Sequence, residues 1–306
     1  MKGLELARGF YEQYGAPMLH EQFPALEGLV AVGLAGSGSE CLGYDDELSR
    51  DHDFEPGFCL FLPDETLVSR ADAFALERAY ARLPKEYGGL LRATVAPAGG
   101  QRHGVMRTAD FFRRFTGLNG APADWREWLS IPDWALCEAT NGAVFRDDLG
   151  EFSARRAALC AVPEDVRLKK LAGQLFLMAQ SGPYNYERCL RRGDPAAAQL
   201  AALEFVNAAM GAAFTLARRF LPYYKWRFRA LRGLGTLSGL AEPLSEIVLG
   251  RADSRRIGDV CAAVADELRA QGLSPHDGDD LQRHAYAVND RIRDGELRNE
   301  NILAAV

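Results

Sequence analysis

The sequence predicts an α+β protein, in which a small mixed-sheet core is followed by an all-α helical bundle. In the first half of the chain, short apolar runs are bounded by glycine and proline, a pattern that is typical of buried strands. From residue 153 onward the apolar positions follow helical spacing, and almost no strand candidate occurs. We therefore expect an α/β domain at residues 1–152 and a helical bundle at residues 153–306, with the boundary near Phe152.

Helices and strands are expected to alternate in the first half of the chain. A short polar loop, residues 42–49, contains Asp45, Asp46 and Glu47, which we expect to be solvated. Thr108 is placed to cap a helix. The expected helices are residues 2–15 and residues 65–83, the second with Leu67, Phe74, Leu76, Tyr80 and Leu83 on its buried side. The expected strands are residues 29–35, the run beginning at Asp51, residues 90–95, residues 105–108 and residues 143–147, the last of which follows a turn at Thr140-Asn141-Gly142.

The second half is expected to be helical throughout. Pro163 fits the first turn of a helix that runs to about Ala179. Asp194 begins a long alanine-rich helix that ends before Pro222, and a polar-aromatic interlude, residues 181–194, separates the two. The further expected helices are residues 223–231, 242–249, 254–271 and 277–293.

Composition limits the class of protein. The chain has 306 residues, of which 48% are hydrophobic, and this is ample for a packed core. Its net charge of −6 gives no general attraction for nucleic acid, so we do not expect nucleic acid as a partner. No apolar run reaches the length of a membrane span, and the N-terminus lacks a signal peptide pattern. The six cysteines lack CxxC spacing, so they are expected to be reduced core residues of a cytoplasmic protein with no membrane partner.

The first predicted strand leads into a glycine-serine turn, GSGSE, at residues 36–40. Gly36 and Gly38 allow the backbone to turn tightly and to come close to a ligand. Such a turn can leave backbone N–H groups that face a phosphate, and Ser39 adds a hydroxyl donor. We therefore expect Gly36, Ser37, Gly38 and Ser39 to hold the phosphates of a nucleotide.

Two aspartates follow the turn. In a strand, residues two apart point to the same side, so Asp51 and Asp53 would present two carboxylates together. Two adjacent carboxylates repel each other, and a divalent cation such as Mg²⁺ or Mn²⁺ removes that repulsion. A phosphate-binding turn and a metal-binding pair together indicate nucleotidyl transfer from ATP or another nucleoside triphosphate. Asp51 and Asp53 are therefore the predicted catalytic and metal-binding residues.

The order of these motifs resembles a known signature. Gly38-Ser39, eleven intervening residues and Asp51-x-Asp53, each beside a predicted strand, resemble the signature of the polymerase-beta-type nucleotidyltransferase superfamily. That superfamily includes the kanamycin and lincosamide nucleotidyltransferases. Five segments also resemble a bacterial family of unknown function, whose members join a minimal nucleotidyltransferase domain to a helical C-terminal domain: GLAGSGSE, SRDHDFEPGF, ATNGAVFRD, YNYERCLRRGD and LPYYKWRFRAL. The resemblance implies that Gly38 and Ser39 contact phosphate and that Asp51 and Asp53 hold the metal.

Basic and aromatic residues gather in the predicted bundle, in the segments SGPYNYERCLRR and PYYKWRFR. Lys225 is a candidate phosphate ligand, because an ammonium is a compact charge suited to phosphate, and the neighbouring rings could stack on a base. The alternative is a solvated basic face whose rings pack inside the bundle. In the first half, Arg102 and His103 could also touch phosphate, but an ordinary exposed loop is the favoured interpretation there.

The chain departs from the superfamily pattern at one position. Active members usually add a third carboxylate from a later core strand, where it helps to bind metal or acts as a base. The corresponding strand here is HGVMRT, and Met106 stands where the glutamate is expected. Asp110 follows this strand and Glu86 precedes the neighbouring one. Either another carboxylate takes the role, or the acceptor is activated without it, or the site is weakened.

Three functions remain open. The first is a Mg²⁺-dependent enzyme that moves AMP from ATP onto a hydroxyl or amine of a small molecule or protein. The second is a nucleotide-binding or regulatory protein with a weakened site and a bundle that binds a partner. The third is an antibiotic nucleotidyltransferase, by analogy of fold only. The visible clusters are basic, which favours an anionic or neutral acceptor over a cationic antibiotic.

Overall fold

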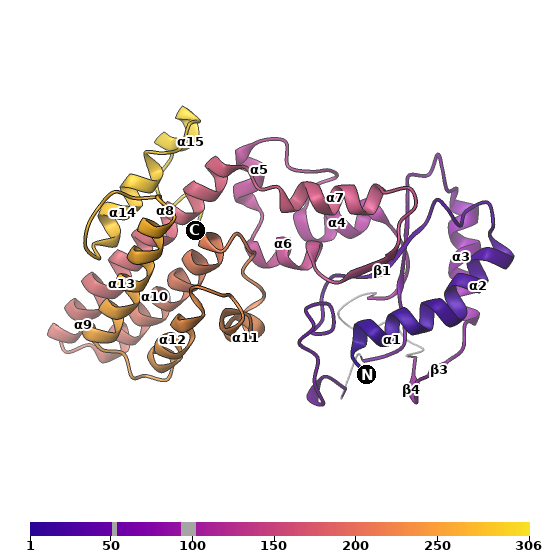
Figure 1. Ribbon diagram of the computed structural model, residues 1–306, viewed down its shortest axis with the longest axis horizontal. Helices are drawn as coiled ribbons and strands as arrows, with labels where there is room; N and C mark the ends of the chain where they lie inside the picture. The colour runs from indigo at the N-terminus through magenta and orange to yellow at the C-terminus, as the bar shows by residue number, and fades with distance from the viewer. Residues whose placement is uncertain (51–53, 93–101) are drawn as a thin grey trace. The chain divides into compact units, whose positions relative to one another are not determined.

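The computed structural model describes residues 1–50, 54–92 and 102–306, and it confirms the predicted α+β class (Figure 1). The chain divides into two compact units. Unit 1 comprises Met1–Pro122 and Ala135–Ala161, and unit 2 comprises Ala123–Trp134 and Val162–Val306. Phe152, the expected boundary, lies in helix α7 (Glu151–Cys160) and packs inside unit 1. The division into two functional domains at this residue stays a prediction.

Unit 1 is built on a four-stranded sheet with the strand order β5-β2-β1-β6. Strand β1 (Ala31–Leu34) is antiparallel to β2 (Cys59–Leu62) and to β6 (Ala143–Arg146). Strand β5 (Gly104–Arg107) runs parallel to β2, which makes the sheet mixed. A separate hairpin pairs the short strands β3 (Glu86–Tyr87) and β4 (Leu90–Leu91).

Alternate residues of β2 face two hydrophobic layers. Leu60 and Leu62 belong to a core that includes residues of the first and third helices. Phe61 points the other way and stacks on Phe152, with the ring centres 4.2 Å apart. This alternation of side chains is expected for a strand in a sheet whose two faces are both covered.

The helices of unit 1 are α1 (Gly3–Phe10), α2 (Ala16–Gln22), α3 (Arg70–Arg82), α4 (Thr108–Thr116), α6 (Asp133–Thr140, whose first two residues belong to unit 2) and α7.

Several local predictions for unit 1 are wrong. The first helix does not end at residue 15, because a π turn, Tyr11–Gly15, joins α1 to α2. Pro17 lies in the first turn of α2, where the missing backbone N–H does not break a helical hydrogen bond. Phe74 is 60% exposed rather than buried, since it lies about 200° around α3 from the buried Leu76. Leu67 is exposed because it precedes the helix, which begins after the Ser69 cap.

The strand predictions need further correction. Strand β2 begins only at Cys59, because Pro56 and Gly57 interrupt the run before it. The strand expected to open at Asp51 is therefore absent from the described residues 54–58. Strand β4 is two residues long, and Thr108 is the first helical residue rather than the cap. Cys160 is exposed, whereas the other five cysteines are buried or half-buried and all six are reduced.

Unit 2 is a helical bundle, as predicted. Helix α8 (Glu164–Ala179) packs against the long α10 (Pro195–Leu216) and against α14 (Leu281–Asn289). The Asp194 carboxylate caps α10 by accepting a hydrogen bond from the backbone N–H of Ala197 at 2.9 Å. The remaining helices are α5 (Trp125–Ser130), α9 (Glu187–Arg191), α11 (Arg227–Arg232), α12 (Ala241–Val248), α13 (Ser254–Ala270) and α15 (Gly295–Asn299).

The polar-aromatic segment between the two long helices is not a break in the helix. The chain stays helical, because a π turn, Gln180–Tyr186, joins α8 directly to α9 and accommodates Pro183. Helix α10 is the one helix, among the residues that the structure describes, with the length and apolar composition to cross a membrane, so the expectation that no apolar segment has the length of a membrane span is wrong. Because 61% of its apolar window is buried within the fold, it also meets the description of a core helix.

Candidate functional site

The glycine-serine turn after β1 adopts a backbone that only glycine tolerates at two positions. Gly36 has φ +106° and Gly38 has φ +134°, both in the region that L side chains rarely adopt. A Cβ at Gly38 would also lie 2.1 Å from Nη2 of Arg102. Glycine at position 38 is therefore required both by the backbone and by the close approach of the arginine.

The end of α6 holds the turn in place. The backbone N–H of Gly36 donates to Oδ1 of Asn141 at 2.8 Å, and Nδ2 of Asn141 donates back to the Gly36 carbonyl at 2.8 Å. The Ser37 hydroxyl donates to Oε2 of Glu138 at 2.6 Å. These partners lie about a hundred residues away in sequence, so nothing in the local pattern around the turn predicts them.

Three successive backbone amides of the turn stay available. Within residues 1–50, 54–92 and 102–306, the N–H groups of Ser37, Gly38 and Ser39 donate to no backbone carbonyl or side chain. Consecutive free amides in a turn with positive φ angles form a concave site for an anion. The predicted phosphate-binding role of the turn is compatible with this geometry.

A buried ion pair lies against the turn. Nη2 of Arg102 donates to the Ser37 carbonyl at 3.1 Å and pairs with the Glu40 carboxylate. The two side chains are only 17% and 8% exposed, so the exposed-loop interpretation of Arg102 is wrong. The parallel pairing of β5 with β2 explains the position of Arg102, because it brings the residues just before β5 beside Cys59. The Cys59 thiol donates a hydrogen bond to the Arg102 carbonyl at 3.2 Å. His103 is also half-buried, with Nδ1 3.4 Å from Oε1 of Glu55.

A cleft of about 170 Å³ opens beside the turn. Gly36 and Ser37 form one side, and the aromatic rings of Phe111 and Phe115 form an apolar wall. Met106 lies on this cleft, so the position expected for a third carboxylate does face the site. The polar groups that line it are Arg102, Asp110 and Arg114. Asp110 therefore reaches the cleft from the first turn of α4, although it is not on the strand itself.

The predicted metal ligands Asp51 and Asp53 lie outside the described residues. The chain just before them lies at the turn, because the Ser39 hydroxyl donates to the Ser49 hydroxyl at 3.1 Å, and Ser49 is two residues before Asp51. In the described part of the chain, no group of three or more His, Cys, Asp or Glu side chains is placed to hold a metal ion.

The loop between the turn and the aspartates is anchored rather than solvated. Asp45 is buried and accepts a hydrogen bond from the backbone N–H of Gly3 at 3.0 Å, with Nζ of Lys2 3.7 Å from the same carboxylate. The prediction that Asp45 is solvated is therefore wrong, whereas Asp46 and Glu47 are exposed as expected. The anchor ties this loop to the start of α1.

The thiols near the turn do not suit nucleophilic chemistry. Burial raises the pKa of Cys59 to about 12. Burial also raises the pKa of Cys41 well above its usual range, and the Glu40 carboxylate adds to that rise. Because the thiolate is the reactive form, the raised pKa values of Cys41 and Cys59 disfavour nucleophilic attack by either thiol at neutral pH.

Lys225 lies in unit 2, on a 3₁₀ turn (Tyr224–Trp226) just before α11. It is exposed, and its Nζ lies 5.1 Å from the centre of the Trp226 ring. The neighbouring Tyr223 and Tyr224 rings are also exposed, with centres 4.4 Å apart. The surface is basic and aromatic, as the sequence indicated, and the role of Lys225 as a phosphate ligand stays a prediction.

Comparison with known proteins gives one match. A family model described as a domain of unknown function (DUF4037) matches residues 128–227. The matched region includes Glu138, Asn141 and Lys225 but not the glycine-serine turn. Searches of curated proteins and of solved structures return no match.

Proposed function

We propose that the protein is a Mg²⁺-dependent nucleotidyltransferase that moves a nucleoside monophosphate, AMP from ATP in the first instance, onto a hydroxyl or amine of a small molecule or protein. The turn at residues 36–39 binds the phosphates of the nucleotide, and Asp51 and Asp53 hold the metal. We also propose a bacterial, cytoplasmic protein with no membrane or nucleic acid partner. Mn²⁺ could replace Mg²⁺, and another nucleoside triphosphate could replace ATP.

One observation carries the proposal: three backbone amides of the turn that donate to no described residue lie beside the segment that leads to the two aspartates. The amides of Ser37, Gly38 and Ser39 offer an anion site among the described residues. The contact of Ser49 with Ser39 keeps the chain two residues before Asp51 at the same place. An extended residue spans at most about 3.6 Å, so only a short length of chain separates Ser49 from Asp51, and the proposal requires Asp51 to meet a phosphate bound at the turn.

The residues around the turn would each do one task. The amides would bind phosphate oxygens, and the Arg102 guanidinium, now held by Glu40 and the Ser37 carbonyl, would add positive charge on the same side. Phe111 and Phe115 would exclude water from the cleft. Bound Mg²⁺ would neutralise charge on the phosphates. Asp110 and Glu138 are the described carboxylates best placed to replace the missing strand acid, because Asp110 lines the cleft and Glu138 bonds the turn.

The decisive experiment removes the predicted metal ligands. Asp51→Asn with Asp53→Asn should abolish Mg²⁺-dependent release of pyrophosphate from ATP, a loss of about a thousandfold or more, because the variant removes both carboxylates that we propose as metal ligands. The matched control removes two exposed carboxylates of the same unit, Glu21→Gln with Glu47→Gln, and should keep full activity. Unchanged pyrophosphate release by the Asp51/Asp53 variant would refute the proposal.

A weakened, regulatory nucleotide-binding protein is the second candidate. The observation that favours it is Met106 on the cleft, where an active enzyme is expected to carry an acid. Calorimetry with ATP and Mg²⁺, followed by a turnover assay with a panel of hydroxyl and amine acceptors, separates the two. Binding with no pyrophosphate release from any acceptor supports the regulatory protein, and release supports the enzyme.

A further inference from the structure

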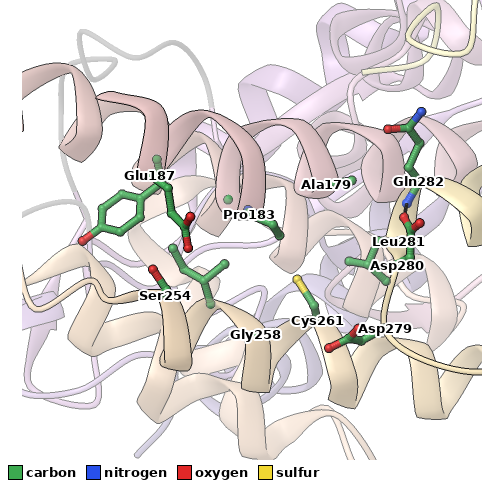
Figure 2. A pocket seen from close by; sticks show the side chains of 13 residues that line it. Ala179, Pro183, Glu187, Ser254, Gly258, Cys261, Asp279, Asp280, Leu281 and Gln282 are labelled. Atoms are coloured by element: carbon green, nitrogen blue, oxygen red, sulfur yellow. Dashed lines mark hydrogen bonds between the residues drawn. The ribbon is translucent and has the colours of Figure 1, made fainter. Parts of the chain in front are cut away.

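Unit 2 contains a cavity of about 340 Å³ that the nucleotide proposal does not use. It lies where the π turn at Gln180–Tyr186 faces the first half of α13 and the start of α14 (Figure 2). A π turn widens the helix and is frequent at functional sites. The helices keep the space open by using small residues at the wall, among them Ala179 and Gly258, and a Cβ built on Gly258 meets no atom within 4 Å.

The charges that line this cavity are all of one sign. Of its 13 lining residues, all of which the structure describes, three are acidic and none is basic. In Figure 2, Glu187 and Ser254 lie at one side of the cavity, and Asp279 and Asp280 lie at the other, beside Cys261. Arginines on the outer surface pair with two of these carboxylates, Arg191 with Glu187 at 2.9 Å and Arg283 with Asp280 at 3.2 Å.

The middle of the cavity is apolar. Ile257, Leu281 and the ring of Pro183 line it between the two acidic sides. The Cys261 thiol also faces this space, is 2% exposed and makes no hydrogen bond to any residue that the structure describes. Ser254 and Cys261, which line the two ends of this wall, are seven residues apart on α13, a rise of about 10 Å along the helix.

We propose that this cavity binds an aliphatic diamine or polyamine. One ammonium group would meet Glu187 and the other would meet Asp279 and Asp280, while the carbon chain between them would pack on Ile257, Leu281 and Cys261. Pockets of this size hold small organic ligands, and a few placed polar groups at an apolar pocket fix their orientation. This site does not depend on nucleotidyl transfer, because every residue in it belongs to unit 2.

The test measures binding of 1,5-diaminopentane by calorimetry at 0.15 M salt, with 1-aminopentane, pentan-1-ol and pentanoate as probes of equal length. The diamine should bind about tenfold more tightly than the monoamine, because it makes a second charge-assisted hydrogen bond, and pentanoate should not bind. Gly258→Leu fills the cavity and should abolish diamine binding, whereas Gly295→Leu, at an exposed helical position of the same unit, should leave it unchanged.

Two further variants keep the cavity open and remove charge. Glu187→Gln and Asp279→Asn should each weaken diamine binding about tenfold while the monoamine loses affinity in only one of them. These variants test the proposal even if Gly258→Leu does not fold. No binding of the diamine, equal binding of the diamine and pentan-1-ol, or unchanged diamine binding in Gly258→Leu would each overturn the proposal. The first would show that there is no site, the second that apolar contact alone governs binding, and the third that the diamine binds elsewhere by general attraction to an acidic protein.

Discussion

The turn in unit 1 and the cavity in unit 2 are assembled in different ways. At the turn, residues 36–39 are held by Arg102, Glu138 and Asn141, which come from distant parts of the chain. In the cavity, the wall is formed by helices whose own boundaries follow from local signals, such as the Asp253 and Asp280 caps of α13 and α14. The turn is therefore positioned by side chains from far along the chain, whereas the ends of the helices around the cavity are set by caps that lie within a few residues.

The largest loss of stability is expected when the ion pair between Arg102 and Glu40 at the turn is broken. Arg102→Ala leaves the Glu40 carboxylate buried with its partner removed, which should cost about 3 kcal/mol of the free energy of unfolding of unit 1. Arg102→Ala combined with Glu40→Gln should cost clearly less than the sum of the single changes, because no charge is then left alone. The coupling between the two residues is the quantity that tests whether the contacts at the turn cooperate.

The chain offers a convenient way to assign this loss to one unit. All four tryptophans, Trp125, Trp128, Trp134 and Trp226, lie in unit 2. Hydrogen exchange of peptides from residues 30–50 should therefore accelerate in Arg102→Ala, while the urea transition followed by tryptophan fluorescence should shift little. Additive single changes, or an equal shift of the fluorescence transition, would contradict the comparison.

A smaller effect is expected for the glycine at the centre of the turn. Gly38→Ala forces a side chain into φ +134° and against Arg102, which should cost about 1–3 kcal/mol and weaken ATP binding. Gly43→Ala is the matched control, because Gly43 has φ +71° but nothing within 4 Å of the added Cβ. It should cost about 1 kcal/mol and leave ATP binding intact. Equal loss of ATP binding in both variants would show that backbone strain, and not the approach of Arg102, governs the site.

The sequence predicted the fold class and the positions of most helices, because these depend on apolar spacing and on caps that lie within a few residues. It also predicted the strand that precedes the turn, since β1 is short, apolar and followed by glycine. It did not predict that Arg102 is buried or that Asp45 is an anchor, because both depend on contacts with residues more than forty positions away. Glu138 and Asn141 had only the signal of a TNG turn near them, which says nothing of their partners. The π turns were missed because Pro17 and Pro183 suggest a break in a helix.

The smallest change in stability is expected at the first turn of α8 in unit 2, where an arginine pairs with a glutamate three residues before it. The Arg167 guanidinium donates to Glu164 in the first turn of α8 and lowers the pKa of this carboxyl from 4.5 to about 2, with Arg218 adding to the effect. A carboxyl with a lowered pKa in the folded state stabilises the protein above pH 4.5 and loses this contribution as the pH falls from about 4.5 to about 2. Because Glu164 is 48% exposed, solvent screening limits the contribution to less than about 1 kcal/mol.

Glu164→Gln keeps a side-chain oxygen that can accept a hydrogen bond from the buried Arg167 guanidinium, so it should lower the stability of unit 2 only slightly at pH 7 and flatten its decline below pH 4.5. Glu242→Gln, at an exposed position on α12, should follow the unsubstituted protein. Tryptophan fluorescence during urea titrations at several pH values measures the difference, and a loss of several kcal/mol would show that the first turn of α8 is coupled to distant contacts, as the turn in unit 1 is.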